Sequence, residues 1–392
     1  MKTTETHIMD EHKDTPVREE RPELIDQALI APYLKELFGY ERFVEGLKAF
    51  LPEKLFHHIM EMKDQVDTIE GFQTDIILHI LNLIEQISIR ELTSGGLEHL
   101  NPGKQYLFIS NHRDIVLDSA FLNTTLFKRG FRTSQIAIGD NLMRHRISDL
   151  IFRMNKSFVV KRTGSPTELY KYSVLLSEHI RTQITEGIDS VWIAQREGRA
   201  KDGNDRTQTG LLKMLTLGQQ GDLKSFFRSL NIVPVAISYE FDPCDLLKAQ
   251  EFVNKKNNPE YKKSFDEDLQ HILLGLRGQK GRVHFEFGKP LQEELEIFDE
   301  LPNSKKQLEA LAGIIDKCTH KNYALHGINE IADKLLREDN SPCTRCEEGE
   351  ELKLLDYFSR KKQQLQNDTD GSGYRYLLGM YANPLINAQS EE

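Results

Sequence analysis

The segment "SNHRDIVLD" (residues 110–118) places one histidine and two aspartates close together, where the apolar run "YLFIS" ends. A neutral imidazole, with an ordinary pKa of about 6.5, can remove the proton of an attacking hydroxyl at neutral pH. A carboxylate on the other ring nitrogen fixes the tautomer and stabilises the protonated ring. His112 with Asp114 or Asp118 is therefore a candidate general base.

The letters "HRD" also occur in the catalytic loop of protein kinases, but the rest of that loop is absent. A kinase needs an Asn five residues after the Asp, and Ser119 stands there. The sequence has no G-x-G-x-x-G loop, V-A-I-K strand, D-F-G motif or P-loop. It also lacks the G-x-S-x-G elbow of serine hydrolases. Phosphoryl transfer from ATP and a covalent serine mechanism are excluded.

Short runs rich in β-branched and aromatic residues alternate with helical stretches after residue 104. This alternation predicts an α/β domain with a mixed, largely parallel sheet flanked by helices. Ligands of such sheets bind beyond the carboxyl ends of the strands, where the polar segments of this chain stand. The predicted strands are residues 106–110, 135–139, 157–162, 190–195, 232–240 and 282–288.

The charge of the chain is uneven. The net charge is -10, which argues against nucleic acid as a partner. Residues 128–213 nevertheless contain 16 Lys and Arg against 9 Asp and Glu, a net of +7. A basic middle in an acidic chain suggests an anionic ligand, although a solvated face without a ligand is the alternative.

Residues 106–240 resemble the glycerol-phosphate acyltransferase superfamily, whose members carry four blocks in a fixed order. Each block follows or forms a predicted strand, and the order and spacing agree with the family. The matching residues are His112 and Asp118 in the first block, Lys161 and Arg162 of "SFVVKRT" in the second, Glu197, Gly198 and Arg199 of "REGRAKDG" in the third, and Pro234 of "IVPVAISYE" in the fourth.

The resemblance implies transfer of a fatty acyl chain from acyl-CoA or acyl carrier protein to a hydroxyl of glycerol 3-phosphate. No metal or organic cofactor is expected, since the acyl thioester is a co-substrate. The alternatives are a 1-acylglycerol-3-phosphate or other lysophospholipid as the acceptor, and a non-catalytic lipid-binding relative. The implied roles are base for His112 with Asp118 or Asp114, acceptor phosphate binding for Arg162, Lys161, Glu197, Gly198 and Arg199, and the acyl-donor side for Pro234.

Two blocks depart from the family pattern. Asp118 lies six residues after His112, where the family has five. Either a loop absorbs the extra residue or Asp114 is the partner; we favour Asp118, because Asp114 falls where a helix N-cap is favourable. Arg113 is expected at the surface or beside the phosphate. In the third block Glu197 lies one position later than the family's Glu, which puts the identity of the acceptor in question.

Flanking segments are predicted to be helical and peripheral to this domain. Residues 72–89 have an amphipathic helical pattern, and no apolar run reaches the roughly 20 residues of a spanning helix. The predicted parts are a disordered tail (1–20), an N-terminal helical region (21–98), the acyltransferase domain (99–292), and a C-terminal helical region with a flexible tail (293–392).

The cellular location is predicted from three features. The polar N-terminal residues lack the positive start and apolar run of a signal peptide. Four cysteines suggest a reducing compartment without disulfides. The single C-x-x-C of Cys343 and Cys346 is expected to be a loop, because zinc needs four ligands. Because the expected acyl donor and product are hydrophobic, we expect contact with a membrane. We therefore expect a cytoplasmic protein, peripheral on the inner face of the membrane, attached through its N-terminal helices.

Overall fold

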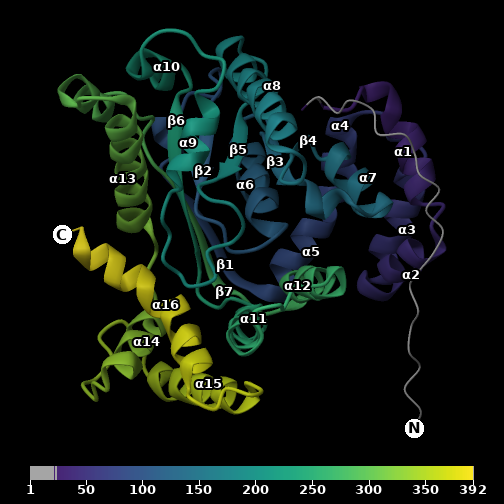
Figure 1. The fold of residues 1–392 in the computed structure, drawn as a ribbon. Coiled ribbons are helices and arrows are strands. Elements are labelled where there is room, and N and C mark those ends of the chain that lie inside the picture. The colour runs from purple at the N-terminus through teal and green to yellow at the C-terminus, as the bar shows by residue number, and fades with distance from the viewer. Residues whose placement is uncertain (1–21, 23, 392) are drawn as a thin grey trace.

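The computed structural model describes residue 22 and residues 24–391, so the predicted tail at residues 1–20 lies outside the described residues (Figure 1). The described chain forms a seven-stranded sheet of order β1-β7-β6-β2-β5-β3-β4. Only β6 and β7 pair antiparallel among these strands, which confirms the predicted mixed, largely parallel α/β sheet. The strands are β1 Ile89–Gly95, β2 Leu107–Ser110, β3 Gln135–Gly139, β4 Ser157–Val160, β5 Val191–Ala194, β6 Ile232–Tyr239 and β7 Gly281–Phe287.

Each of the six predicted strand segments contains a strand, but β1 has no counterpart in the prediction. This strand lies at one edge of the sheet and pairs with β7. Most of its side chains are exposed or half-buried, so it lacks the continuous apolar run of a strand covered on both faces. The sheet consequently begins at Ile89, and the predicted domain boundary at residue 99 falls too late in the chain.

Helices cover both faces of the sheet. One core lies between the sheet and α8, α9, α10 and α13, and the other between the sheet and α5 and α6. A capping box of Ser165 and Glu168, with Pro166 in the first turn, starts α8. The bounds are α6 Leu117–Lys128, α7 Arg146–Met154, α8 Pro166–Thr185, α9 Thr209–Leu215, α10 Leu223–Ser229, α11 Asp245–Asn257, α12 Phe265–Arg277 and α13 Ser304–Asn322.

The N-terminal helices gather at one end of the molecule (Figure 1) and share a core with α7. The predicted helix over residues 72–89 is present up to Ser88, with a π-helical segment at Phe72–Ile77. No helix in the described part of the chain is long and apolar enough to cross a bilayer. The bounds are α1 Ile30–Leu37, α2 Glu41–Phe50, α3 Glu53–Met62, α4 Ile69–Gly71 and α5 Leu78–Ser88.

The C-terminal helices form a separate core with α11, and the prediction of a flexible tail was wrong for the residues described. Residues 372–390 form α16, although the sequence there contains Pro384 and two glycines. Leu377, Tyr381 and Leu385 recur at helical spacing and are buried, so packing overrides weak helix propensity. The bounds are α14 Gly327–Arg337, α15 Glu350–Gln364 and α16 Ser372–Ser390.

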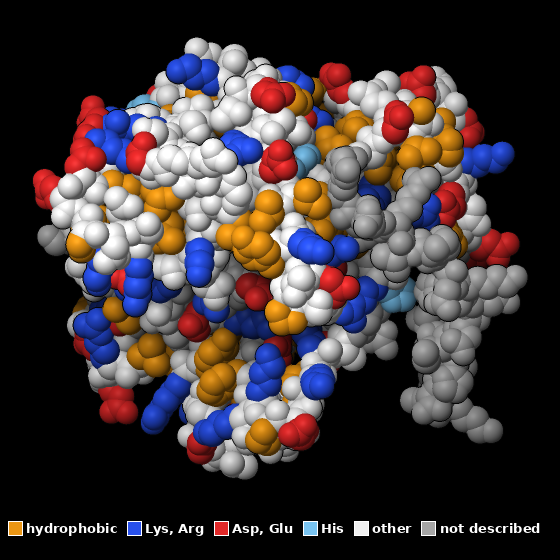
Figure 2. Space-filling view, turned by 45° about the horizontal axis from the view of Figure 1, so that its top comes forward, with side chains coloured by type: hydrophobic (Ala, Val, Ile, Leu, Met, Phe, Trp, Pro, Cys, Tyr) orange, Lys and Arg blue, Asp and Glu red, His pale blue; other side chains and the backbone are white. Residues whose placement is uncertain are grey.

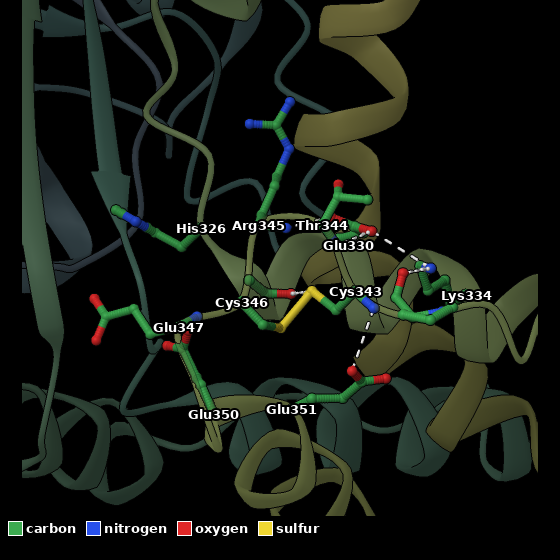
Figure 3. The surroundings of a disulfide bond; sticks show 12 residues. His326, Glu330, Lys334, Cys343, Thr344, Arg345, Cys346, Glu347, Glu350 and Glu351 are labelled. Carbon is green, nitrogen blue, oxygen red and sulfur yellow. Dashed lines mark hydrogen bonds and ion pairs between the residues drawn. A yellow bond between two sulfur atoms is a disulfide. The ribbon is translucent and has the colours of Figure 1, made fainter.

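The C-x-x-C segment forms the expected loop between α14 and α15, but it contains a disulfide between Cys343 and Cys346 (Figure 3). The expectation of a chain without disulfides was therefore wrong at this pair. The loop curls over Glu330, whose carboxylate accepts hydrogen bonds from the backbone N–H groups of Thr344 and Arg345. This turn brings the two sulfur atoms together, which the cysteine count alone could not reveal.

Candidate active site

The base loop, here defined as residues 111–118, runs from the end of β2 into the first turn of α6 and holds His112 against Asp118. The Nδ1 atom of His112 lies 2.8 Å from Oδ2 of Asp118, which is fully buried. The same oxygen accepts the backbone N–H groups of Arg113 and Asp114. Because the loop wraps around the carboxylate, it absorbs the extra residue that separates this His and Asp from the family spacing.

The other candidate partner, Asp114, lies just before α6 and makes no hydrogen bond to His112. Its Oδ1 accepts the backbone N–H groups of Val116 and Leu117, each at 2.9 Å. Burial raises the pKa of Asp114, and the negative charge of Asp118 adds to the rise. Asp118 therefore contacts the ring, whereas Asp114 binds the backbone at the start of α6, where Val116 is the N-cap residue.

Two aromatic residues that the sequence did not single out surround the pair. The indole of Trp192 meets the His112 ring edge to face, with centroids 5.6 Å apart, and its Nε1–H donates to Oγ of Ser110 at 2.9 Å. Burial raises the pKa of Tyr239 well above its ordinary value, and the charge of Asp118 adds to this. The phenol is therefore neutral, and the only signal for either residue was its place in an apolar strand.

Arg113 is buried and not at the surface, contrary to expectation. Its Nη2–H group donates to Asp205, and its guanidinium lies 5.3 Å from the centre of the Tyr323 ring. Asn111 donates to the same Asp205 at 3.2 Å. A buried cation is stable only when it is paired, and here the pair ties the base loop to the segment after β5.

His112 lines a pocket of about 310 Å³ at the carboxyl ends of the parallel strands. The two acidic residues in its wall each pair with a lysine of the same wall, at 2.6 and 2.5 Å, so the arginines leave the pocket positively charged. This excess suits an anionic ligand. The charged residues of the lining are Arg162, Arg196, Arg199, Lys201, Glu251, Lys263 and Asp268.

Arg199 belongs to the segment after β5, here called the arginine loop (residues 195–208). Gly198, directly before it, has a φ of 67°, a conformation that favours glycine. The Arg199 side chain is almost buried, and its Nη1 lies 3.3 Å from Nδ1 of His271. Arg162, from the turn after β4, reaches the same pocket, and its Nε lies 3.6 Å from Oε1 of Glu197.

Three predicted site residues lie apart from the pocket lining. Glu197 is exposed and meets Arg162 from outside. The Nζ atom of Lys161 lies 4.9 Å from the centre of the Tyr172 ring, against α8. Pro234 is buried within β6, in register with Ile109, so it lines neither this pocket nor the cavity described next. The structure therefore brings together His112, Asp118, Arg162, Gly198 and Arg199.

A larger cavity of about 650 Å³ adjoins the basic pocket and has a mainly apolar wall. Ser119, Ile136 and Phe152 line both spaces. The wall comes mostly from α4 to α7, including Ile77, Leu81 and Ile84. An elongated apolar molecule in this cavity would have its polar end near His112. Sequence reasoning identified the apolar stripe of residues 72–89 but not the cavity.

Part of this chain is similar to known proteins. Residues 91–238 match the family model described as Acyltransferase. Over this stretch the chain is similar to acyltransferases. The glycerol-3-phosphate acyltransferase of Pseudomonas syringae pv. tomato is 26% identical over 54% of this chain and 24% of its own length. That of Ectopseudomonas mendocina is 27% identical over 50% of this chain and 22% of its own. The chain thus matches about a quarter of the length of these relatives.

Among solved structures, a crystal structure of the 1-acyl-sn-glycerophosphate acyltransferase from Thermotoga maritima is similar to 73% of this chain and to 92% of its own. The TM-score is 0.36 and the sequence identity 11%. Within the described residues, no group of three or more His, Cys, Asp and Glu could hold a metal ion. Part of the pocket wall, including Glu251 and Lys263, lies outside the matched residues 91–238. His271, which contacts Arg199 from behind this wall, also lies outside them.

Proposed function

We propose that this protein is an O-acyltransferase that moves a fatty acyl chain from acyl-CoA or acyl carrier protein to a hydroxyl of glycerol 3-phosphate or a related phospholipid precursor. The His112–Asp118 contact carries this proposal, because it stands in a basic pocket that shares a wall with an apolar cavity. The thioester is the co-substrate, and the proposal includes no metal or organic cofactor.

His112 is the general base of the proposed reaction. Since Nδ1 faces Asp118, the ring presents Nε2 to the acceptor hydroxyl. As the hydroxyl oxygen bonds to the thioester carbonyl carbon, its proton passes to Nε2, and Asp118 stabilises the imidazolium. The tetrahedral intermediate then breaks its C–S bond, and the departing thiolate takes the proton from Nε2. No acyl-enzyme forms in this sequence.

The two spaces beside His112 suit the two ends of the reaction. Guanidinium groups bind phosphate bidentately, so Arg199, Arg162 and Arg196 are the proposed acceptor site. Holding the phosphate there places the hydroxyl near the base, which lowers the entropic part of the barrier. The apolar cavity is the proposed place of the acyl chain.

We further propose that the protein works at a bilayer surface, where its lipid substrates and products reside. On the face drawn in Figure 2, Lys and Arg side chains stand between patches of hydrophobic side chains. Such a mixture supports contact with an anionic lipid surface through both burial and charge. Co-sedimentation with vesicles of phosphatidylglycerol, compared with phosphatidylcholine alone, measures this contact, and equal absence from both pellets would contradict it.

The test of the reaction is an acyl-transfer assay. The purified protein is incubated with labelled palmitoyl-CoA or palmitoyl carrier protein and with glycerol 3-phosphate, 1-acylglycerol 3-phosphate or glycerol. We expect transfer to a phosphate-bearing acceptor, and a loss of about 10² to 10⁴ in rate for His112→Ala. His179→Ala is the matched control, since His179 hydrogen-bonds Gln135 at 2.8 Å and does not line the pocket.

The outcomes separate the candidates. Preference for 1-acylglycerol 3-phosphate over glycerol 3-phosphate would identify the lysophospholipid acceptor. Acceptor-dependent transfer that is unchanged in His112→Ala would remove His112 as the base. Absence of transfer to every acceptor, from both donors, would remove the catalytic proposal.

A further inference from the structure

His271, a residue of α12, lies behind the proposed phosphate site and outside the matched residues 91–238. The residue is buried, with 3% of its surface exposed, and its Nδ1 lies 3.3 Å from Nη1 of Arg199. An arginine can only donate hydrogen bonds, so Nδ1 must accept this one. The His271 ring is therefore neutral, with its proton on Nε2.

The surroundings of His271 keep the ring in that state. Burial lowers its pKa to about 3, and the positive charges of Arg199, Lys263 and Lys248 act in the same direction, while Glu251 opposes them. Nδ1 of His271 consequently remains a hydrogen-bond acceptor at every pH near neutrality. It is a fixed partner for Arg199 and not a group that titrates during the reaction.

The helix that carries His271 also contacts the base loop. A Cβ atom on Gly275 would lie 2.3 Å from Oδ2 of Asp114, so α12 packs directly on that carboxylate. One turn earlier, the backbone carbonyl of His271 accepts the Sγ–H of Cys244, at the start of α11, at 3.3 Å. These contacts fix the His271 ring relative to the loop that holds His112.

Arg199 has another direction in which it could turn. Its positive charge opposes the rise that burial gives to the pKa of Asp114. A guanidinium without a fixed partner would be drawn toward that buried carboxylate and away from the pocket. The bond to His271 keeps the guanidinium where it can face a ligand.

We propose that His271 is a positioning residue that aims the Arg199 guanidinium at the phosphate of the acceptor and thereby selects acceptors that carry a phosphate monoester. This inference rests on the proposed function for the identity of the acceptor. The proposed selection comes from a helix beyond the matched residues 91–238, so a change at this one position would alter acceptor affinity without touching the base.

The test compares three variants with the wild-type protein. His271→Phe keeps an aromatic ring but removes the hydrogen-bond acceptor Nδ1, whereas His271→Asn retains an amide oxygen near the position of Nδ1. His179→Phe makes the same exchange at a histidine away from the pocket. Binding of glycerol 3-phosphate is measured by calorimetry, and KM and kcat by acyl transfer. We expect about tenfold weaker binding and a matching rise in KM for His271→Phe, with kcat within about threefold.

The conservative variant makes the result specific. His271→Asn should bind glycerol 3-phosphate within about threefold of wild type, because the charge-assisted hydrogen bond is retained. His179→Phe should bind as wild type does. If His271→Phe does not fold, as judged by circular dichroism, His271→Ala takes its place in the same comparison.

Three results would overturn the inference. One is a wild-type protein that does not bind glycerol 3-phosphate at millimolar concentration. Another is equal binding of glycerol 3-phosphate by the wild-type protein and by His271→Phe. The third is a fall in kcat with no change in KM. By contrast, normal binding by wild type with no acyl transfer to any acceptor would contradict the proposed function and leave the role of His271 standing.

Discussion

The base loop and the arginine loop line one pocket but are stabilised in different ways. The base loop folds around Asp118, which lies within the loop and binds both its histidine and its backbone. Contacts to the arginine loop come from four helices beyond residues 91–238, through His271 of α12, Glu251 of α11, Asp316 and His320 of α13, and Asn383 of α16. The proposed base and its carboxylate partner thus lie within one segment, whereas the proposed acceptor site depends on remote segments.

The C-terminal helix α16 shows how close that dependence is. Asn383 donates to the carbonyl of Asp202 at 2.6 Å, and Asn387 donates to Asn204 at 3.3 Å. Gly203, between these two loop residues, lies so near α16 that a Cβ atom would be 2.3 Å from the carbonyl oxygen of Met380. The arginine loop therefore has its shape only when the C-terminal helices are in place.

Asp118→Asn should have the largest effect on kcat, and it changes a residue of the base loop alone. An amide can replace the carboxylate in size but cannot stabilise the imidazolium or favour the correct tautomer, so we expect kcat to fall by about 10² to 10⁴. The KM for glycerol 3-phosphate should change little, because the arginines are not touched. Steady-state kinetics check this. A kcat within threefold of wild type would mean that His112 does not act as the proposed base.

Arg199→Ala should affect the other half of the comparison. Loss of a charge-assisted contact to phosphate is worth about 1.5 to 3 kcal/mol, or about 10- to 150-fold in the KM for glycerol 3-phosphate. Glycerol, which has no phosphate, should react at its wild-type rate. Arg206→Ala is the control, since Arg206 is in the same loop but half-exposed near Asp316. Equal losses with both acceptors would show that Arg199 supports the fold and not the phosphate.

Gly203→Ala tests whether α16 shapes the arginine loop. The residue has a φ of 71° and no room for a Cβ atom, so we expect the free energy of unfolding to fall by about 1 to 3 kcal/mol. KM should rise with it while kcat is largely kept. Denaturant unfolding and steady-state kinetics measure the two effects. Gly210→Ala, where nothing lies within 4 Å of the added Cβ, is the control and should be neutral or stabilising.

The same contrast explains what the sequence could and could not predict. His112 and Asp118 were found because both stand in one short segment after an apolar strand, and the structure joins them. Arg199 was found through a glycine-containing turn. His271 has no motif around it, because its role depends on a contact across 72 positions of the chain.

The fold divides along the same line. Strand β3 was predicted at its observed bounds, and the other five predicted strands agree to within two residues at each end. The apolar run of β3 reflects burial on both faces. The exposed edge strand β1 and the helix α16 were missed, because their places are set by neighbours and not by their own patterns. Arg113 was assigned to the surface or to the phosphate side for a similar reason: the Asp205 that pairs with it lies 92 positions away.

The smallest effect is expected from the disulfide in the C-terminal region. It closes a ring of only four residues, so the entropy it removes from the unfolded chain is worth about 2 kcal/mol at most. Cys343→Ser with Cys346→Ser should lower the melting temperature by a few degrees, as should a reducing agent on the wild-type protein, with the double variant insensitive to it. Neither KM nor kcat should move, since the loop contacts α14 and α15 and not the pocket lining. A rise in KM alone would show that the support of the arginine loop extends through α16 to α14, against which α16 packs.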